Sequence, residues 1–275
     1  MKTLALNCIN EGKSLNRKQS LLAAAKRMSI TDINIVDGNE GDYVLNIQPF
    51  TFAKGKEWTG MWHIDVMLGG DPVKYYDEVD TLFVSSPIMS EPRGFAITLF
   101  QGIDPLLHRR IPEIKQEYDF IICGSVGHPF HNERERAYGV LKKAGFTYKD
   151  YGKGFGPEEY VRNYNTAKVQ FVRSGNANGL DGALAQRFFE SIAIGPTLIN
   201  YSSDLMYIGL SEERHFLAYR NDEEMVAKMH ELLDADHRNG MHLRAREIAL
   251  TLHTYEHRLI SITNVIKDHI IGTSQ

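Results

Sequence analysis

The stretch from residue 186 to residue 197, which reads QRFFESIAIGPT, decides how the second half of the chain is expected to fold. Apolar side chains recur through it as far as Ile194, with the spacing of a helix that packs against a sheet. The Gly-Pro pair that follows predicts where this helix ends. Glu190 is the exception on the apolar face, and its carboxylate needs a partner because burying an unpaired charge is costly. One alternative is an ion pair with Arg187, three residues earlier on a half-exposed face.

On both sides of this stretch, short apolar runs alternate with helical segments. This alternation predicts an α/β fold built on mostly parallel sheets. Strands are expected at 3–8, 33–36, 43–47, 58–64, 80–84, 95–99, 120–123, 147–148, 168–172, 197–200 and 215–219. Besides the stretch that begins at residue 186, helices are expected at 15–28, 132–144, 157–164, 223–234, 238–252 and 255–270.

The length and one polar segment indicate two domains. A chain of 275 residues can bury one large core or two smaller ones. The polar, proline-marked segment at 102–112 has the composition of a connection between domains. We therefore expect an N-terminal domain over residues 1–105, a second domain over residues 106–252 and a terminal segment over residues 253–275.

The composition excludes several classes of protein. With 31 basic and 35 acidic residues the net charge is −4, which argues against bulk electrostatic attachment to nucleic acid but leaves a local basic groove open. Cys8 and Cys123 stand far apart in apolar runs and are expected to be buried free thiols in a reducing compartment. The apolar runs are too short for a signal peptide or for the ~20 residues that span a bilayer. We therefore expect a cytoplasmic protein.

A first candidate ligand site follows the strand expected at 120–123. A glycine-bearing turn begins there with Gly124 and Ser125, and the helix after it carries Arg134 and Arg136. Glycines allow a close approach of the backbone to an anion, and the N-terminus of a helix favours phosphate. A plain tight turn is the alternative, since the spacing matches neither the Walker motif nor the dinucleotide fingerprint.

A second candidate site is the loop that leads into the opening stretch. It contains Arg173, Ser174 and Asn176, and small residues of this kind can present several backbone N–H groups to an anion. The alternative is a flexible surface loop. The loop is followed on the next helix by Arg187 and Glu190. A cation, a loop and a carboxylate together suit a phosphorylated sugar, with arginine binding phosphate and Glu190 binding hydroxyls.

A third candidate pair ends the strand expected at 58–64. His63 and Asp65 lie two residues apart and share one face of a strand, where either could act as general base toward an acceptor hydroxyl. A structural histidine with a turn-forming aspartate is the alternative. Asp234 and Asp236 are interpreted as a solvated helix end, and the eleven histidines lack metal-ligand spacing. No metal site and no cofactor are therefore expected.

Four segments in order resemble the spore-maturation-type (CgeB-like) glycosyltransferases, relatives of the GT-B group-4 enzymes. The more specific ones are the stretch 187–195, RFFESIAIG, and the segment 253–258, HTYEHR. The segment 119–125, DFIICGS, and Tyr151-Gly152 with the stretch 160–168 complete the series. The resemblance covers the chain from about residue 100 onward.

This resemblance implies a GT-B-like fold, in which two Rossmann-like domains with parallel sheets face each other across a cleft. The C-terminal helix, within 253–275, would cross back to pack on the first domain. The second domain would hold a nucleotide-diphosphate sugar, with Glu190 on donor hydroxyls and Arg187 and the loop at 174–178 near the diphosphate. No bound metal would be needed, because Arg side chains, N–H groups and helix dipoles stabilise the leaving diphosphate. The anomeric configuration would be retained.

The expected acceptor is a hydroxyl group of a glycan, a small molecule or a modified base in DNA. A base inside a duplex would have to be flipped out. For DNA, Lys54, Lys56, Lys74 and Arg93 are candidates for a local basic patch. The alternative function is a non-catalytic nucleotide or sugar-phosphate binding module. Gly182 favours this alternative, because it stands where many relatives carry a second acidic residue.

Overall fold

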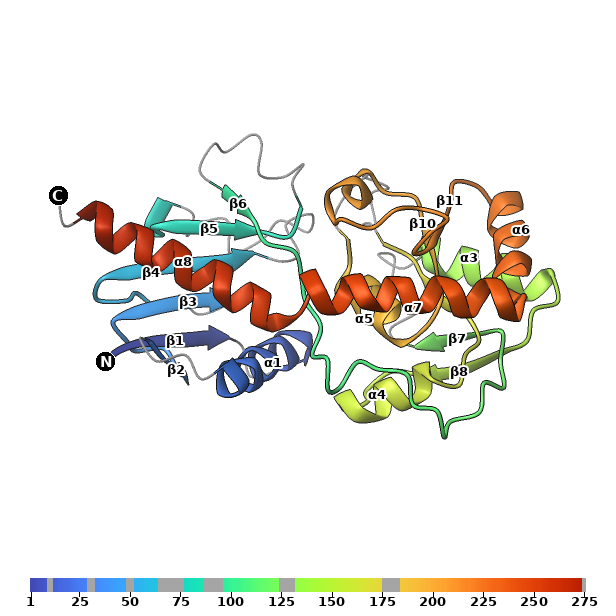
Figure 1. Cartoon of the computed structure of the whole chain (residues 1–275), viewed down its shortest axis with the longest axis horizontal. Helices are drawn as coiled ribbons and strands as arrows, with labels where there is room; N and C mark the ends of the chain where they lie inside the picture. The colour runs from blue at the N-terminus through green and yellow to red at the C-terminus, as the bar shows by residue number, and fades with distance from the viewer. Residues whose placement is uncertain are drawn as a thin grey trace. The chain divides into compact units, whose positions relative to one another are not determined.

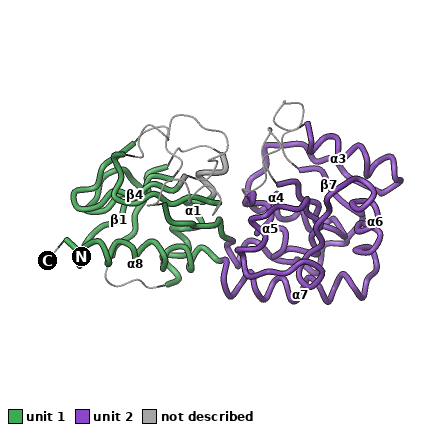
Figure 2. Tube along the Cα trace, turned by 90° about the horizontal axis from the view of Figure 1, so that it is seen from above, with its two compact units in different colours: residues 1–102, 254–275 green, residues 103–253 purple. Residues whose placement is uncertain are grey.

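The structure is a computed structural model of the chain, and it describes residues 1–8, 12–28, 33–47, 52–63, 77–86, 96–123, 132–174 and 184–273. The chain divides into two compact units (Figures 1 and 2). Unit 1 consists of Met1–Gly102 and Thr254–Gln275, and unit 2 consists of Ile103–His253. Within the described ranges, every helix is too short or too polar to cross a membrane.

Unit 1 is built on a six-stranded parallel sheet in the order β2-β1-β3-β4-β5-β6. Two helices, α1 (Gly12–Met28) and α8 (Tyr255–Thr273), share one hydrophobic core with this sheet. From α1 this core takes Leu21, and from α8 it takes Leu259 and Ile262. The expectation that the C-terminal helix returns to the first half of the chain is thereby confirmed. The strands are β1 (Lys2–Cys8), β2 (Ile33–Asp37), β3 (Tyr43–Ile47), β4 (Trp58–His63), β5 (Thr81–Val84) and β6 (Ala96–Thr98).

The described residues of unit 2 form five parallel strands in two groups that meet at their N-terminal ends. One group is β7 (Phe120–Cys123) with β8 (Tyr148–Gly152), and the other has the order β11-β10-β9. A bridge between Tyr118 and Ala167, just before β7 and β9, places these two strands side by side. The carboxyl ends of the strands therefore lie along one edge, where ligands bind in open parallel sheets. The remaining strands are β9 (Gln170–Val172), β10 (Thr197–Asn200) and β11 (Leu217–Tyr219).

Alternating residues of β7 divide the helices of unit 2 between two faces. Phe120 and Ile122 pack with α3 and α6, whereas Ile121 and Cys123 pack with α4 and the end of α5. This follows from the period of two in a strand that is buried on both faces. As a result α4 and α5 lie on the same face and meet each other. The helices are α3 (Asn132–Lys143), α4 (Pro157–Tyr164), α5 (Gln186–Ile194), α6 (Asp222–Leu233) and α7 (Ala235–Leu252), with a short 3₁₀ helix at Ser203–Tyr207.

The ranges predicted at 120–123, 157–164 and 197–200 are found unchanged. The strand predicted at 147–148 is β8, which begins at Tyr148 and continues to Gly152. Most of β8 is exposed and polar, so hydrophobic pattern could not indicate its length. Asp234 is the N-cap of α7 and accepts hydrogen bonds from the N–H groups of Asp236 and His237, which confirms its interpretation as a helix end.

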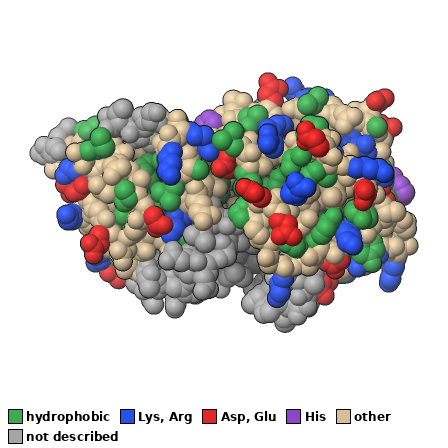
Figure 3. All heavy atoms as spheres, turned by 90° about the horizontal axis from the view of Figure 1, so that it is seen from below, with side chains coloured by type: hydrophobic (Ala, Val, Ile, Leu, Met, Phe, Trp, Pro, Cys, Tyr) green, Lys and Arg blue, Asp and Glu red, His purple; other side chains and the backbone are tan. Residues whose placement is uncertain are grey.

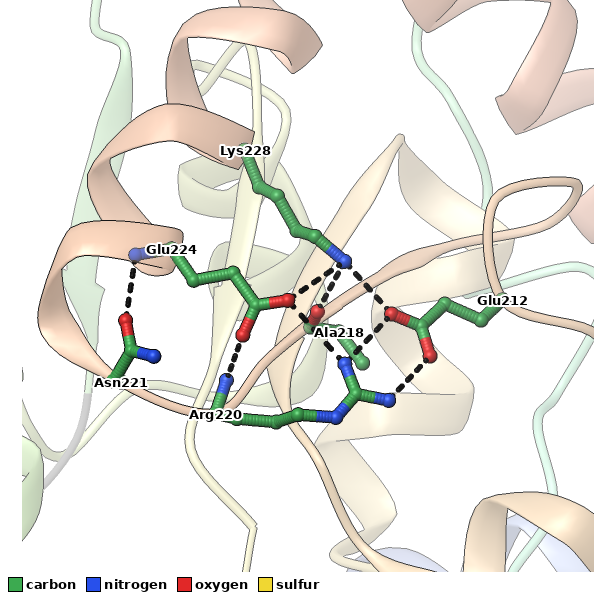
Figure 4. Close-up of polar contacts among 6 residues, drawn as sticks. All are labelled: Glu212, Ala218, Arg220, Asn221, Glu224 and Lys228. Atoms are coloured by element: carbon green, nitrogen blue, oxygen red, sulfur yellow. Dashed lines mark hydrogen bonds and ion pairs between the residues drawn. The ribbon is translucent and has the colours of Figure 1, made fainter.

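A charge network joins α6 to the carboxyl end of β11 (Figure 4). The Lys228 ammonium donates hydrogen bonds to the carbonyl of Ala218 at 2.6 Å and to Glu212 at 2.7 Å, and it lies 3.3 Å from Glu224. Arg220 contacts the same two carboxylates. The Lys228 side chain is 15% exposed and that of Arg220 is 49% exposed, so the lysine contacts are the less screened by solvent.

Replacing Lys228 with methionine is expected to lower the free energy of unfolding by about 1–3 kcal/mol at neutral pH, because two carboxylates lose a largely buried partner. Burial raises the pKa of Glu212 and Glu224, but hydrogen bonds with Arg220 and Lys228 outweigh it and the net direction is downward. Their contribution is therefore complete above the unfolded carboxyl pKa and is lost as the pH falls through the lower folded values. Denaturant unfolding should show a penalty that shrinks as the pH falls below the ordinary carboxyl pKa. The exposed Lys153, changed to methionine, is the control, and an equal loss there would contradict the assignment.

Candidate functional site

The carboxylate of Glu190, on the first turns of α5, is held by side chains from three parts of unit 2. Only 8% of the residue is exposed. Oε2 accepts a hydrogen bond from the Tyr160 hydroxyl of α4 at 2.9 Å, and Oε1 accepts one from Gln186 Nε2 at 2.7 Å. His108 Nε2 lies 3.5 Å from Oε1. Among the described residues, Arg187 forms neither a hydrogen bond nor an ion pair with this carboxylate. The Glu190–Arg187 ion pair, the alternative considered from the sequence, is therefore not found there.

Arg187, one turn earlier on the same helix, is a partly buried cation whose donors are not filled by the described residues. It forms no hydrogen bond or ion pair with any residue in the described part of the chain. Burial acts to lower the pKa of Arg187, whereas the surrounding tyrosines and Glu190 act to raise it, and the net direction is upward. A guanidinium presents five N–H donors, and burying them unmet is costly unless an anion completes the site. The tyrosines concerned are Tyr138 of α3 and Tyr160 and Tyr164 of α4.

A second guanidinium stands close to the first. Arg134, on the first turn of α3, has its pKa lowered by burial and by the positive charge of Arg187. Arg187 also acts on the Cys123 thiol, whose pKa burial raises to about 12, and Cys123 is the last residue of β7. The two arginines therefore converge near the carboxyl end of a central strand. An anion with more than one negative charge, such as a diphosphate, fits such a pair.

The hydroxyls around this arginine pair are neutral hydrogen-bond donors. Burial, followed by the negative charge of Glu190, raises the pKa of Tyr160 well above its ordinary value. Burial likewise raises the pKa of Tyr164 and of Tyr138. The rings of Tyr160 and Tyr164 lie 4.4 Å apart, one turn from each other on α4. Neutral phenols beside a cation and a carboxylate suit a ligand that carries both phosphate and hydroxyl groups.

Two other predicted residues, Arg173 and Ser174, directly follow the carboxyl end of β9. The Ser174 N–H donates to Asn200 Oδ1 at 2.6 Å, and the Ser174 hydroxyl oxygen accepts from the N–H of Ala185, the N-cap of α5, at 3.3 Å. Ser174 thus ties the start of α5 to the end of β10. Arg173 contacts Glu133 at 3.8 Å, in the first turn of α3, and the carbonyl of Ser174. Among the described residues, its ion-pair partner is this carboxylate.

Several predicted site residues lie outside the described part of the chain. Asp65, Gly124, Ser125 and Asn176 belong to this group, as does Gly182. The backbone of His63 ends β4, but its side chain is not described. For the basic patch, Lys54 forms an ion pair with Glu78 at 2.9 Å, Lys56 is exposed, and Lys74 and Arg93 lie outside the described residues.

Sequence reasoning assigned no role to four residues that the structure brings to Glu190 and Arg187: His108, Tyr138, Tyr160 and Gln186. Tyr160 stood inside the segment that carries the family resemblance, and Gln186 precedes Glu190 by one helical turn, a spacing that allows their hydrogen bond. No pattern in the sequence points to His108. Over the described ranges, no cluster of three or more His, Cys, Asp or Glu residues could hold a metal ion.

Solved structures share this fold over nearly the whole chain. A glycosyltransferase from Rickettsia africae ESF-5 matches with a TM-score of 0.66 at 10% sequence identity, over 98% of this chain and 98% of its own. The DNA modifying enzyme β-glucosyltransferase, solved in the presence and absence of uridine diphosphoglucose, gives 0.61 at 15% identity over 98% and 99%. Anabaena Alr3699/HepE in complex with UDP-glucose gives 0.64 at 9% identity over 96% and 100%. At these identities the likeness shows the fold alone, and it confirms the predicted GT-B-like α/β fold.

The sequence itself gives the family. No curated protein matches the chain. The glycosyl transferase-like family matches it over residues 103–264, which is more than half of its length. All the residues around Arg187 and Glu190 described above fall inside this match, and the chain belongs to the glycosyl transferase-like family.

Proposed function

We propose that the protein transfers a sugar from a nucleotide-diphosphate sugar to a hydroxyl acceptor, and that unit 2 binds the donor. The observation that carries this proposal is Arg187. It is partly buried near Arg134, and it forms no hydrogen bond or ion pair within the described part of the chain. A bound diphosphate would fill these donors and would offset the repulsion between the two cations.

The remaining contacts suggest which part of the donor lies near which residue. Glu190 lies one turn beyond Arg187 on the same helix, so hydroxyl groups of the donor would meet its carboxylate while phosphates meet the arginines. Two proteins of this fold have been solved in the presence of a uridine diphosphate sugar. A uridine diphosphate sugar is therefore the first donor to test. The order of the four motifs between residues 119 and 258 favours the spore-maturation-type branch of the family.

In the reaction, the bond between the anomeric carbon and the diphosphate breaks, and its electron pair leaves with the diphosphate. A new bond forms from the acceptor oxygen, whose proton passes to a base, for which His63 and Asp65 remain the candidates. Arg134 and Arg187 would carry the charge that develops on the leaving diphosphate, so the proposed reaction needs no metal ion. Retention of the anomeric configuration follows from the group-4 resemblance. We place the reaction in the cytoplasm, in keeping with two free cysteines, Cys8 and Cys123.

The acceptor is the least constrained part of the proposal. Figure 3 shows one face of the molecule, on which Lys and Arg side chains lie among Asp and Glu side chains rather than in a basic strip. Lys54, a candidate contact for DNA, is already paired with Glu78. These observations favour a glycan or small-molecule hydroxyl over a base in DNA. A non-catalytic binding module is the second candidate, and Gly182 in place of a family carboxylate is the observation that favours it.

The test is a panel of UDP-, GDP- and TDP-sugars assayed for release of the nucleotide in the presence of a chelator. Release from one donor, stimulated by an added acceptor, is expected. The acceptor set should include short glycans, small-molecule alcohols and DNA that contains hydroxymethylated bases. Tight binding of a nucleotide without release would favour the binding module, and absence of binding across the panel would contradict the proposal.

A further inference from the structure

His108 stands five residues after the start of unit 2, and a backbone contact fixes its protonation pattern. Its Nδ1 accepts a hydrogen bond from the N–H of Asp104 at 3.0 Å. A backbone N–H can only donate, so Nδ1 carries no proton and the neutral ring carries its proton on Nε2. The residue is 4% exposed, so water does not compete freely for this ring.

The proton on Nε2 faces Glu190. His108 Nε2 is 3.5 Å from Glu190 Oε1, at the far end of hydrogen-bond range, where catalytic contacts often lie before a ligand binds. The backbone of His108 is itself anchored to α5, which fixes the position of the ring. Arg246 Nη1 donates both to the carbonyl of His108 at 3.2 Å and to the carbonyl of Ala193, near the end of α5, at 2.7 Å. The segment that carries His108 is thereby fastened to the helix that carries Glu190.

The donors around Glu190 are unevenly divided between its two oxygens. Oε1 accepts from Gln186 and faces His108, whereas Oε2 accepts from Tyr160 alone. A carboxylate offers about four lone-pair positions, two on each oxygen. Gln186 takes one position of Oε1, His108 faces the other at 3.5 Å, and one position of Oε2 remains among the described contacts.

We propose that His108 is a positioning residue for the donor site. It holds Oε1 of Glu190 and so directs the remaining position of Oε2 toward a ribose hydroxyl of the donor. This inference rests on the proposed function, in which Glu190 binds that hydroxyl. It adds a residue from the segment at the start of unit 2 to a site otherwise built from α3, α4 and α5.

Two substitutions of His108 distinguish the role of Nδ1 from the role of Nε2. In His108→Asn the side-chain oxygen can take the place of Nδ1 toward Asp104, but no donor reaches Glu190. In His108→Gln the amide nitrogen can take the place of Nε2. With UDP as the probe, His108→Asn is expected to weaken binding about threefold to tenfold, and His108→Gln to stay within about twofold of the native protein. Calorimetric titration measures both, and thermal unfolding of each variant checks its fold.

His215 supplies a matched control. Its Nδ1 accepts a hydrogen bond from the N–H of Ser211 at 2.9 Å, four residues back, as His108 does from Asp104, but it belongs to another part of unit 2. His215→Asn is expected to leave UDP binding unchanged. Equal weakening in His215→Asn and His108→Asn would assign the effect to the turn and overturn the positioning role. Native affinity in His108→Asn would overturn it as well, while the proposed function stood.

A second measurement needs no donor. Nitrogen-15 spectra of the histidine rings should show His108 protonated on Nε2, and the Nε2 resonance should move in Glu190→Gln. A proton on Nδ1, or an unmoved resonance, would overturn the inference. If the native protein binds no nucleotide, the proposed function fails, and these spectra still decide whether His108 holds Glu190.

Discussion

Replacing Arg187 with methionine is expected to weaken the binding of UDP by about 100-fold or more. Two hydrogen bonds between a guanidinium and a phosphate contribute about 1.5–3 kcal/mol each, which corresponds to a factor of that size. Arg187→Lys keeps the charge but loses the planar fork, so an intermediate loss of about tenfold is expected. Calorimetric titration of the purified variants gives both values. Arg136→Met is the control, because this arginine is half exposed and paired with Asp222 and Glu133.

The same Arg187 variant has a second, opposite effect on stability. Removing a partly buried cation that finds no partner among the described residues should leave the melting temperature of the unliganded protein unchanged or raise it. Addition of UDP should then stabilise the native protein but not the variant, as binding linkage requires. A melting temperature that falls by many degrees without ligand would indicate that Arg187 holds the fold. In that event the diphosphate role would be wrong.

Replacing Glu190 with alanine is expected to lower kcat/KM for the donor at least tenfold. The reason is the loss of the only carboxylate that the described residues bring to Arg187 and the tyrosine pair of α4. Glu190→Gln keeps the volume of the side chain but removes its charge, so it shows how much of the effect is due to the charge. Because the Tyr160 hydroxyl loses its acceptor in Glu190→Ala, a loss of about 1–2 kcal/mol in the free energy of unfolding should accompany the kinetic effect.

A deoxynucleotide identifies the group that Glu190 binds. If its carboxylate accepts a ribose hydroxyl, 2′-deoxy-UDP should bind the native protein more weakly than UDP, by about tenfold. In Glu190→Ala the two nucleotides should bind alike, since the acceptor of that hydroxyl has gone. Tyr160→Phe is the companion variant, and it should reduce the discrimination without abolishing it. Equal preference for UDP in the native protein and in Glu190→Ala would exclude the ribose 2′-hydroxyl as the ligand of this residue.

The sequence predicted the elements well because hydrophobic period and stop signals are local. The helix that begins at Gln186 ends before Gly195, as its Gly-Pro pair indicated, and β7 has its predicted bounds. The need of Glu190 for a partner was also predictable, because a carboxylate in an apolar face is costly to bury. Its partners were not. Tyr160 lies 30 residues away on another helix, and periodicity defines a face without saying which other face it meets.

The same limit applies to the site as a whole. Arg134, Arg187 and Glu190, three of the predicted site residues, come together in unit 2, and their roles in donor binding stay predictions until they are measured. His108 could not have been found, since its role depends on a backbone contact with Asp104 and on the path of a connection between elements. Sequence pattern carries little information about connections, because they are neither periodic nor uniformly buried.

Unit 1 draws its core from both ends of the chain, and this has a consequence for biosynthesis. Residues of α8 such as Leu259 and Ile262 share that core with β1, yet the ribosome makes them only after the whole of unit 2. Unit 2 is continuous, so its chain is complete when His253 emerges, whereas the sheet that began at Lys2 must wait for the final helix. The order of folding is therefore expected to be the reverse of the order of synthesis. A nonsense mutation just before α8 would leave a finished unit 2 attached to an uncovered apolar sheet, which is a substrate for chaperones and proteases.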